Sequence, residues 1–199
     1  TQALMQKAGA EVIFNENILT IAEGKYKEFD FATLLEPDWS AAAFWYQMAD
    51  FVPDANLFLK DLKKQSVQGD SVLPDIYAQL GINSLFTDDG LRLVKSGKSL
   101  PETFSYDFTD CPDLAQAVIV TCAGLGIKGQ FTGLGSLRVK ETDRIEALRA
   151  ELTKLGYGVE VIDDRNILNG KVPSDKKNSE TRLVKCYDDH RMAMAFAPL

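Results

Sequence analysis

Residues 147–168 read ALRAELTKLGYGVEVIDDRNIL, and this stretch decides the fold. A helical apolar stripe runs into a glycine, a short strand, a polar turn and a second strand. The same order recurs in residues 75–94, DIYAQLGINSLFTDDGLRLV, and in residues 2–21, QALMQKAGAEVIFNENILTI. A pattern that returns at intervals of about 75 residues indicates an internal structural repeat.

Glycine marks the end of each of these predicted helices. Gly9, Gly81 and Gly156 stand where the apolar stripe stops, and helices commonly end at a glycine in the left-handed conformation. In the second copy, Asp89 and Gly90 predict a tight hairpin turn between two strands. Each copy is therefore expected to form a helix followed by a β-hairpin.

A second element has the same period and consists of an aspartate ahead of a run of small and apolar residues. Aspartate is a preferred N-cap, so each copy predicts a capped and buried helix. The aspartates are Asp38, Asp113 and Asp189, in EPDWSAAAFWYQMA (36–49), DCPDLAQAVIVTCAGL (110–125) and YDDHRMAMAFA (187–197).

Strands complete the repeat. Candidate strands precede the three buried helices at 29–34, 103–108 and 181–186. Together with the hairpins, they predict a repeating βαβαββ unit and an α/β (α+β) fold.

These units divide the chain. We expect one unit over residues 25–96, a second over 98–170 and a partial third over 171–199, with residues 1–24 as the tail of a preceding unit. An array that begins and ends within a unit leaves hydrophobic faces uncovered. We therefore expect a truncated array, that is, a piece of a longer protein.

The composition allows a substantial core and excludes some partners. Of the 199 residues, 45% are hydrophobic and 26% are charged. The formal net charge of −7 argues against nucleic acid and against an anionic membrane as the main partner, because phosphate binding needs a basic surface. No apolar run approaches the roughly 18 residues of a membrane span. A cytoplasmic protein without membrane contact is expected.

The sequence offers few ligands for a metal. Cys111, Cys122 and Cys186 have no CxxC spacing and are expected to be reduced thiols. His190 is the single histidine, so a zinc site would have almost no ligands. Neither a metal nor a cofactor is expected.

The first group of candidate functional residues lies in LRVKETDRIEALRAELTKLG, residues 137–156. One turn before its apolar stripe stands Glu141, which must lie outside the helix or face a cleft because a buried unpaired charge is costly. Lys140 and Arg144 flank it. An acid among bases at a helix start suits an anionic substrate and a proton transfer. The alternative is a solvated first turn with ion pairs along the helix.

The second group lies in YDDHRMAMAFA. Arg191 falls in the first turn of a buried helix, where the helix dipole disfavours a cation, and an anionic ligand would compensate. The alternative is an arginine–aspartate pair that caps the helix. For His190, hydrogen bonding at the helix start is expected rather than acid–base catalysis.

RVKETDRIEALRAELTKLG followed about 40 residues later by DDHRMAMAFA resembles the paired C-terminal signatures of the EPSP synthase (3-phosphoshikimate 1-carboxyvinyltransferase) family. CPDLAQA, EPDWSAAAFW and SVQGD resemble three further segments of that family, so the resemblance runs along nearly the whole chain. It implies EPSP synthase-like repeats with helices buried inside and sheets outside. Residues 1–24 would then end the N-terminal domain, and 25–199 would form most of the C-terminal domain.

The resemblance also implies a reaction and its residues. The family joins phosphoenolpyruvate to the 5-hydroxyl of shikimate 3-phosphate, giving EPSP and phosphate, in the shikimate pathway to aromatic amino acids. Asp113 matches the aspartate that contacts the ring hydroxyls of shikimate 3-phosphate and helps to move the proton of the 5-hydroxyl. Glu141 matches the acid implicated in proton transfer at the methylene carbon of phosphoenolpyruvate, and which carboxylate is acid or base in each step stays open. Arg144 and Arg191 match the arginines that bind phosphoenolpyruvate or the inhibitor glyphosate.

Two further positions are implied on the shikimate 3-phosphate side. Lys140 matches a lysine near both ligands, and Ser136 departs from the asparagine that the family commonly has there. Other residues of that family's site have no counterparts in this sequence, so the isolated chain is expected to be inactive. The intact enzyme is expected to be a monomer.

Two other functions stay open. One is a related enolpyruvyl transferase acting on UDP-N-acetylglucosamine, although KETDR and DDHRMAM favour the shikimate enzyme. The other is a non-catalytic repeat domain that binds a small anion or a protein partner.

Overall fold

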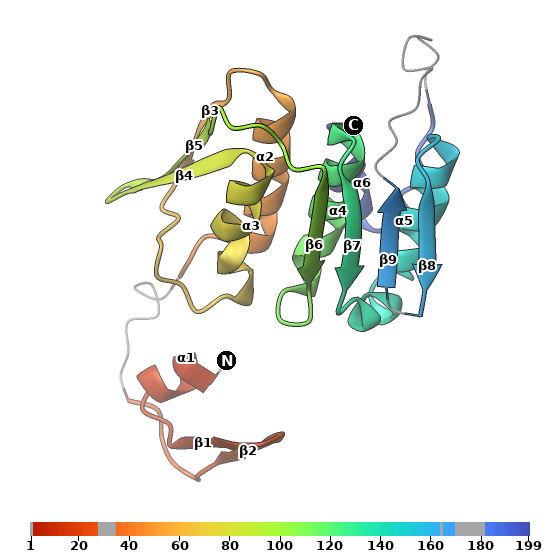
Figure 1. Ribbon diagram of the computed structural model, residues 1–199. Helices are drawn as coiled ribbons and strands as arrows, with labels where there is room; N and C mark the ends of the chain where they lie inside the picture. Colours follow the sequence, from red (N-terminus) through yellow and green to blue (C-terminus); the bar gives the residue numbers. More distant parts are fainter. Residues whose placement is uncertain (1, 28–34, 164, 170–181) are drawn as a thin grey trace. The chain divides into compact units, whose positions relative to one another are not determined.

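The structure is a computed structural model, and the chain divides into two compact units, Thr1–Pro37 and Asp38–Leu199 (Figure 1). The residues that the structure describes are 2–27, 35–163, 165–169 and 182–199.

The described part of the first unit contains one helix and one hairpin. Helix α1 (Gln2–Lys7) is followed by Gly9, whose φ of +89° is the left-handed conformation expected at a helix end. Strands β1 (Val12–Asn15) and β2 (Ile18–Ile21) then pair antiparallel, with Val12 opposite Ile21. The predicted order of helix, glycine and hairpin is therefore confirmed here.

The second unit opens with a repeat built around two helices and a three-stranded sheet. The sheet is antiparallel in the order β3-β5-β4. The elements are α2 (Trp39–Phe51), β3 (Asn56–Lys60), the 3₁₀ turn η2 (Gly69–Val72), α3 (Leu73–Leu80), β4 (Ile82–Thr87) and β5 (Gly90–Lys95). The strand expected at 29–34 lies outside the described residues.

The next repeat shows the complete βαβαββ order. Strands β6 and β7 are parallel and joined through α4, and the sheet continues antiparallel in the order β6-β7-β9-β8. The elements are β6 (Thr103–Asp107), η3 (Pro112–Leu114), α4 (Ala115–Leu125), β7 (Lys128–Thr132), η4 (Gly135–Val139), α5 (Arg144–Lys154), β8 (Val159–Ile162) and β9 (Arg165–Asn169). The predicted unit is confirmed.

The third repeat differs from the prediction. Helix α6 (His190–Phe196) forms as expected, but the strand predicted at 181–186 does not form over its described part, 182–186. The reason is a side chain: the backbone N–H of Lys185 donates to a carboxylate oxygen of Glu151 at 3.0 Å, where a strand would need a neighbouring carbonyl.

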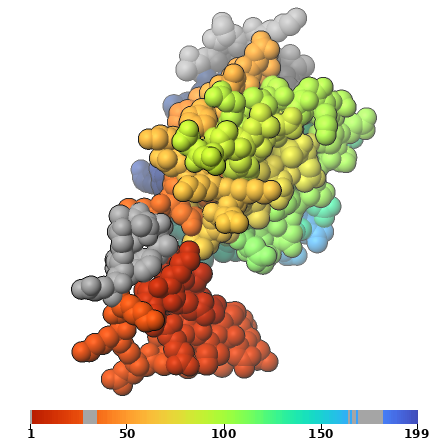
Figure 2. Space-filling model, turned by 90° about the vertical axis from the view of Figure 1, so that its left-hand side faces the viewer, coloured from red at the N-terminus to blue at the C-terminus, as the bar shows by residue number. Residues whose placement is uncertain are grey.

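Helices lie inside and sheets outside, as the resemblance implied. Figure 1 shows α4 and α5 behind the β6-β7-β9-β8 sheet, and Figure 2 shows β4 and β5, in yellow-green, on an outer face of the second unit. Along β7, Gly129 and Phe131 are buried while Lys128 and Gln130 are exposed. In α4 every residue from 115 to 123 is buried, as expected for a helix that is mostly apolar around its whole circumference.

The hairpin between β4 and β5 forms one residue earlier than its sequence suggests. Thr87 pairs with Gly90, so the turn residues are Asp88 and Asp89. Gly90 opens β5 with a φ of +148°, and a Cβ there would lie 2.3 Å from the carbonyl oxygen of Leu59. The glycine is required for the close approach of the neighbouring strand rather than for the turn itself.

The cysteines are free thiols in the described part of the chain. Cys111 and Cys122 are buried free thiols and Cys186 is half-buried. Burial raises the pKa of the Cys111 thiol to about 11, so it stays protonated at neutral pH. Among the described residues no helix has the length and apolar character needed to cross a membrane.

Candidate active site

The three repeated aspartates do not behave alike. Asp38 accepts the backbone N–H of Ser40 at 2.9 Å, and Asp189 accepts that of Arg191 at 2.9 Å, so both are N-caps. Asp113 instead lies within η3, and α4 begins after Leu114 without a side-chain cap. The capping prediction is therefore wrong for Asp113, whose carboxylate is left for other partners.

Arg144 gathers carboxylates from three parts of the chain. It is the first residue of α5, whose N-cap is Asp143. Its side chain is only 1% exposed, and its Nη1 lies 3.1 Å from Oδ1 of Asp113. Its Nη2 lies 2.6 Å from Oε2 of Glu141, and its Nε lies 2.7 Å from Oδ2 of Asp189. A buried guanidinium needs such partners, and its planar fork can meet several at once.

Two more cations contact Asp113. Lys140 Nζ lies 3.3 Å from its Oδ1, and Arg191 Nη2 lies 3.5 Å from its Oδ2. Arg191 also donates to the Asp113 carbonyl oxygen at 3.4 Å. Asp113 therefore lies among three cations, which come from two segments far from it in the sequence.

We call the residues joined by these ion pairs the charged cluster. It contains three cations and three carboxylates, so its formal net charge is zero. Its members are Asp113, Lys140, Glu141, Arg144, Asp189 and Arg191.

The exposure of the cluster is graded. Arg144 and Asp189 are buried, whereas the Glu141 side chain is 48% exposed. Glu141 lies outside α5, in agreement with one of the two positions expected for it. An anion that approaches from solvent therefore meets Glu141 and Lys140 before the buried guanidinium.

Two residues singled out in the sequence lie apart from these ion pairs. Ser136 is exposed in η4, and among the described residues no hydrogen bond or ion pair joins it to the charged cluster. His190 is exposed at the first position of α6, and the described part of the chain gives it no hydrogen-bond partner.

Asp189 belongs to the cluster but was expected only as an N-cap. Burial alone would raise the pKa of its carboxyl, but hydrogen bonds from the Arg144 guanidinium and from the Arg191 and Met192 N–H groups hold that pKa below its usual range. The charged form is thus strongly favoured. In the sequence, the signal for a role of Asp189 in the site was that it occupies the same position in its repeat as Asp113.

Asp70 is a second acid that sequence reasoning missed. It lies in η2, and the Ser40 hydroxyl donates to its carboxylate. Burial raises the pKa of Asp70, the charge of Asp113 adds to that rise, and the charge of Arg191 opposes it. Asp70 is therefore electrostatically linked to the charged cluster. In the sequence it stands in a Gly-Asp-Ser stretch, which is typical of an ordinary turn.

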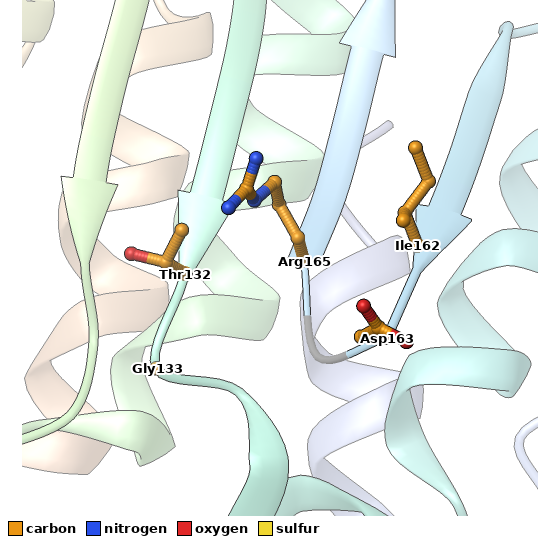
Figure 3. A pocket seen from close by; sticks show the side chains of 5 residues that line it. All are labelled: Thr132, Gly133, Ile162, Asp163 and Arg165. Atoms are coloured by element: carbon orange, nitrogen blue, oxygen red, sulfur yellow. The ribbon is translucent and has the colours of Figure 1, made fainter.

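A pocket of about 370 Å³ lies elsewhere, at the end of β7 and the turn between β8 and β9. Figure 3 shows the Arg165 side chain beside Thr132, with Asp163 at the turn. None of the charged cluster lines this pocket. Its single exposed cation gives no basis for assigning a ligand.

The chemistry of the charged cluster is that of anion binding and proton transfer. Among the described residues, no three histidine, cysteine or acidic side chains are placed to hold a metal ion. Arginines suit carboxylate and phosphate groups, and carboxylates in different surroundings suit acid and base roles. Fold and cluster together define an α/β repeat protein in which cations and carboxylates from two successive repeats meet in an arrangement that suits an anionic ligand.

The chain belongs to the EPSP synthase (3-phosphoshikimate 1-carboxyvinyltransferase) family, whose model matches residues 1–198. It is similar to the 3-phosphoshikimate 1-carboxyvinyltransferase of Bacteroides fragilis strain YCH46, with 47% identity over 82% of this chain and 39% of that protein. The protein of the same name from Clostridioides difficile strain 630 is 34% identical over 99% of this chain and 43% of its own length.

A solved structure agrees with this family at the level of fold. The EPSP synthase of Acinetobacter baumannii matches with a TM-score of 0.72 and 22% identity, over 98% of this chain and 46% of that one. The chain spans about two fifths of the length of the curated relatives that it matches.

Proposed function

We propose that this chain provides the phosphoenolpyruvate-binding part of an enzyme that transfers a carboxyvinyl group from phosphoenolpyruvate to the 5-hydroxyl of shikimate 3-phosphate. The observation that carries the proposal is the convergence of Lys140, Arg144 and Arg191 on Asp113, with Glu141 alongside. The family membership of residues 1–198 supports it.

The cations have the binding roles. Arg144 and Arg191 hold the carboxylate and phosphate of phosphoenolpyruvate, and glyphosate would compete at the same place. Lys140 contacts both ligands, and Ser136 contributes to the shikimate 3-phosphate side. Phosphoenolpyruvate carries several negative charges, so a site with three cations fits it.

The carboxylates have the proton-transfer roles. Asp113 takes the proton of the 5-hydroxyl as its oxygen adds to C2 of phosphoenolpyruvate, and Glu141 gives a proton to C3. In the second step C3 loses a proton while the bond from C2 to the phosphate oxygen breaks. The products are EPSP and inorganic phosphate, and no redox step or cofactor is needed.

The remaining parts of the proposal follow the family. Residues 1–24 end one domain and 25–199 form most of another, so the shikimate 3-phosphate site is completed by groups outside this chain. The intact enzyme is proposed to act as a cytoplasmic monomer. The family match favours the shikimate enzyme over the sugar-nucleotide alternative.

The test is a phosphate-release assay on the gene product that contains these 199 residues. We expect release with phosphoenolpyruvate and shikimate 3-phosphate, and none with phosphoenolpyruvate and UDP-N-acetylglucosamine. Phosphate release with phosphoenolpyruvate and UDP-N-acetylglucosamine, but not with phosphoenolpyruvate and shikimate 3-phosphate, would overturn the proposal in favour of the related transferase. No release with either acceptor would favour a non-catalytic repeat domain.

The 199-residue chain alone is expected to give negligible turnover, because charge neutralisation and positioning across a complete site supply much of the rate. Calorimetry should nonetheless detect weak binding of phosphoenolpyruvate. Turnover by the isolated chain close to that of an intact enzyme would contradict this division of the site.

A further inference from the structure

Glu151 is a buried acid in the middle of α5 that the proposed reaction does not use. Its side chain is only 2% exposed. Its Oε1 accepts the Tyr187 hydroxyl at 2.9 Å, and its Oε2 accepts the Lys185 backbone N–H at 3.0 Å. Lys154 forms an ion pair with the same carboxylate. A buried carboxylate is tolerated only with such partners.

Two of these partners belong to residues 185–189, which we call the strap. Tyr187 and Asp188 in the strap both have a φ of +56°. Two successive non-glycine residues in the left-handed region are strained and persist only where surrounding contacts hold them. Lys185 Nζ also lies 4.9 Å from the centre of the Tyr187 ring. The contacts with Glu151 and Lys185 are those that can hold this turn.

The strap ends at Asp189, the buried member of the charged cluster. Asp189 accepts Arg144 Nε at 2.7 Å and caps α6 through the Arg191 N–H at 2.9 Å. Its own N–H donates to the Cys186 carbonyl oxygen at 3.0 Å, which closes the turn. The position of Asp189 is therefore set by the conformation of the strap.

Helix α5 thus contacts the strap at two points. Arg144 binds its end, and Glu151, two helical turns later, binds its beginning. Residues seven apart lie on the same face of a helix. Because both contacts are on one face, α5 holds the strap at each end of the strained turn.

We propose that Glu151 is a positioning residue for the charged cluster. By binding Lys185 and Tyr187 it keeps the strap in its left-handed turn, and the turn presents Asp189 to Arg144 and to the start of α6. The meaning of this arrangement for ligand binding rests on the proposed function. The geometric part of the proposal, that Glu151 maintains the contact between Asp189 and Arg144, does not depend on any ligand.

The test measures the Arg144–Asp189 hydrogen bond directly in the 199-residue chain. The variants are Glu151→Gln and Tyr187→Phe, and the matched control is Glu146→Gln, a partly exposed acid of the same helix that forms an ion pair with Arg149. Hydrogen exchange of the Arg144 Nε–H is followed by NMR, with the amide of Ile119 in α4 as an internal reference for global opening.

We expect Arg144 Nε–H to exchange about tenfold faster or more in Glu151→Gln and in Tyr187→Phe, because each loses a hydrogen bond to a charged group. The Ile119 amide should change much less, and Glu146→Gln should match the parent chain. Adding Asp188→Gly to Tyr187→Phe should slow the exchange again, since glycine adopts the left-handed turn without strain.

Two results would overturn the inference. One is unchanged exchange of Arg144 Nε–H in folded Tyr187→Phe, and the other is equal acceleration of Arg144 and Ile119, which would make Glu151 merely a stabilising residue. Phosphoenolpyruvate binding is measured separately by calorimetry. If the parent chain fails to bind it while the exchange result holds, the proposed function fails and the positioning role stands.

Discussion

At the scale of single residues, Arg144 forms ion pairs with three carboxylates, those of Asp113, Glu141 and Asp189. It is buried, and its pair with the fully buried Asp189 carboxylate is closed to solvent. Arg144→Met would leave that carboxylate without its cation. We expect the free energy of unfolding to fall by about 3–5 kcal/mol, the usual effect of breaking one side of a buried pair. Urea denaturation measures this change.

Arg149→Met is the matched control, because Arg149 lies on the same helix, at an exposed position, and forms an ion pair with Glu146. Its effect should stay within about 0.5 kcal/mol, as for most surface substitutions. Equal effects of the two substitutions would show that the burial of Arg144 contributes nothing beyond helix propensity.

Asp70 is a residue whose charge lowers the stability of the fold, because burial is the chief cause that raises its pKa. A raised carboxyl pKa means that stability present below the ordinary value near 3.8 is lost as pH rises through the folded-state pKa. Asp70→Asn keeps an acceptor for Ser40 and removes the charge. We expect this variant to be more stable than the parent at pH 7 and to lose that advantage below pH 3.8.

The comparison for Asp70 is Asp54→Asn, which changes an exposed aspartate in the turn after α2. Urea midpoints of both variants, taken from acid to neutral pH, separate burial from a general loss of negative charge. A stabilisation shared by both variants would mean that net charge, not the surroundings of Asp70, is responsible.

At the scale of an element, α4 contains a polar residue without compensation. Gln116 is fully buried, and among the described residues neither its Nε2 nor its Oε1 has a hydrogen-bond partner. Burying an amide in this way costs about 1–3 kcal/mol. We expect Gln116→Met, which conserves volume, to raise the free energy of unfolding by about 1–2 kcal/mol.

Gln47 in α2 provides the contrast, because it is equally buried but donates to the Ala195 carbonyl oxygen at 2.9 Å. Gln47→Met removes that bond and should give no gain. If Gln116→Met destabilises the chain as well, an internal water satisfies the Gln116 amide, and the apparent lack of partners is not a source of instability.

The repeat itself could be predicted at this scale, and one of its strands could not. Glycines at helix ends and alternating strands gave the βαβαββ order because these are local signals. Residues 182–186 have a strand-like composition, but their conformation depends on a distant carboxylate, Glu151. A tertiary hydrogen bond to a side chain leaves no periodic trace in the sequence.

At the scale of the whole molecule, stability at acid pH depends on buried carboxyl groups whose pKa is lowered. Hydrogen bonds and nearby cations outweigh burial and lower the pKa of Asp189 and of Glu151. A lowered pKa contributes stability that is present above the unfolded-state value and lost as pH falls through the folded-state value. We expect the urea concentration at the unfolding midpoint to decrease as the pH is lowered below about 4.

Glu151→Gln should weaken this loss of stability at acid pH, since it removes one of these buried titrating groups. Glu160→Gln, at an exposed position of β8, should leave the loss of stability at acid pH unchanged. If the parent chain and both variants lose stability in the same way as the pH falls, the contacts of Glu151 with the strap do not govern that loss.

The candidate site was partly predictable from the sequence. Residues near each other in the chain, such as Lys140, Glu141 and Arg144, were expected to act together because they share a helix start. The contacts of Arg144 with Asp113 and Asp189 join different repeats and depend on how the helices pack. The non-capping conformation at Asp113 was hidden for the same reason, since its sequence matches those of two true caps.

The charged cluster has equal numbers of cations and carboxylates, so its cations are already neutralised by carboxylates of the protein itself. In the proposed role, an incoming anion would compete with the protein's own carboxylates, first of all with the exposed Glu141. Its affinity would then be the difference between two anions competing for the same guanidinium. We therefore expect the cluster to discriminate against chloride and other monovalent anions and to favour ligands that bring two or more negative charges at once.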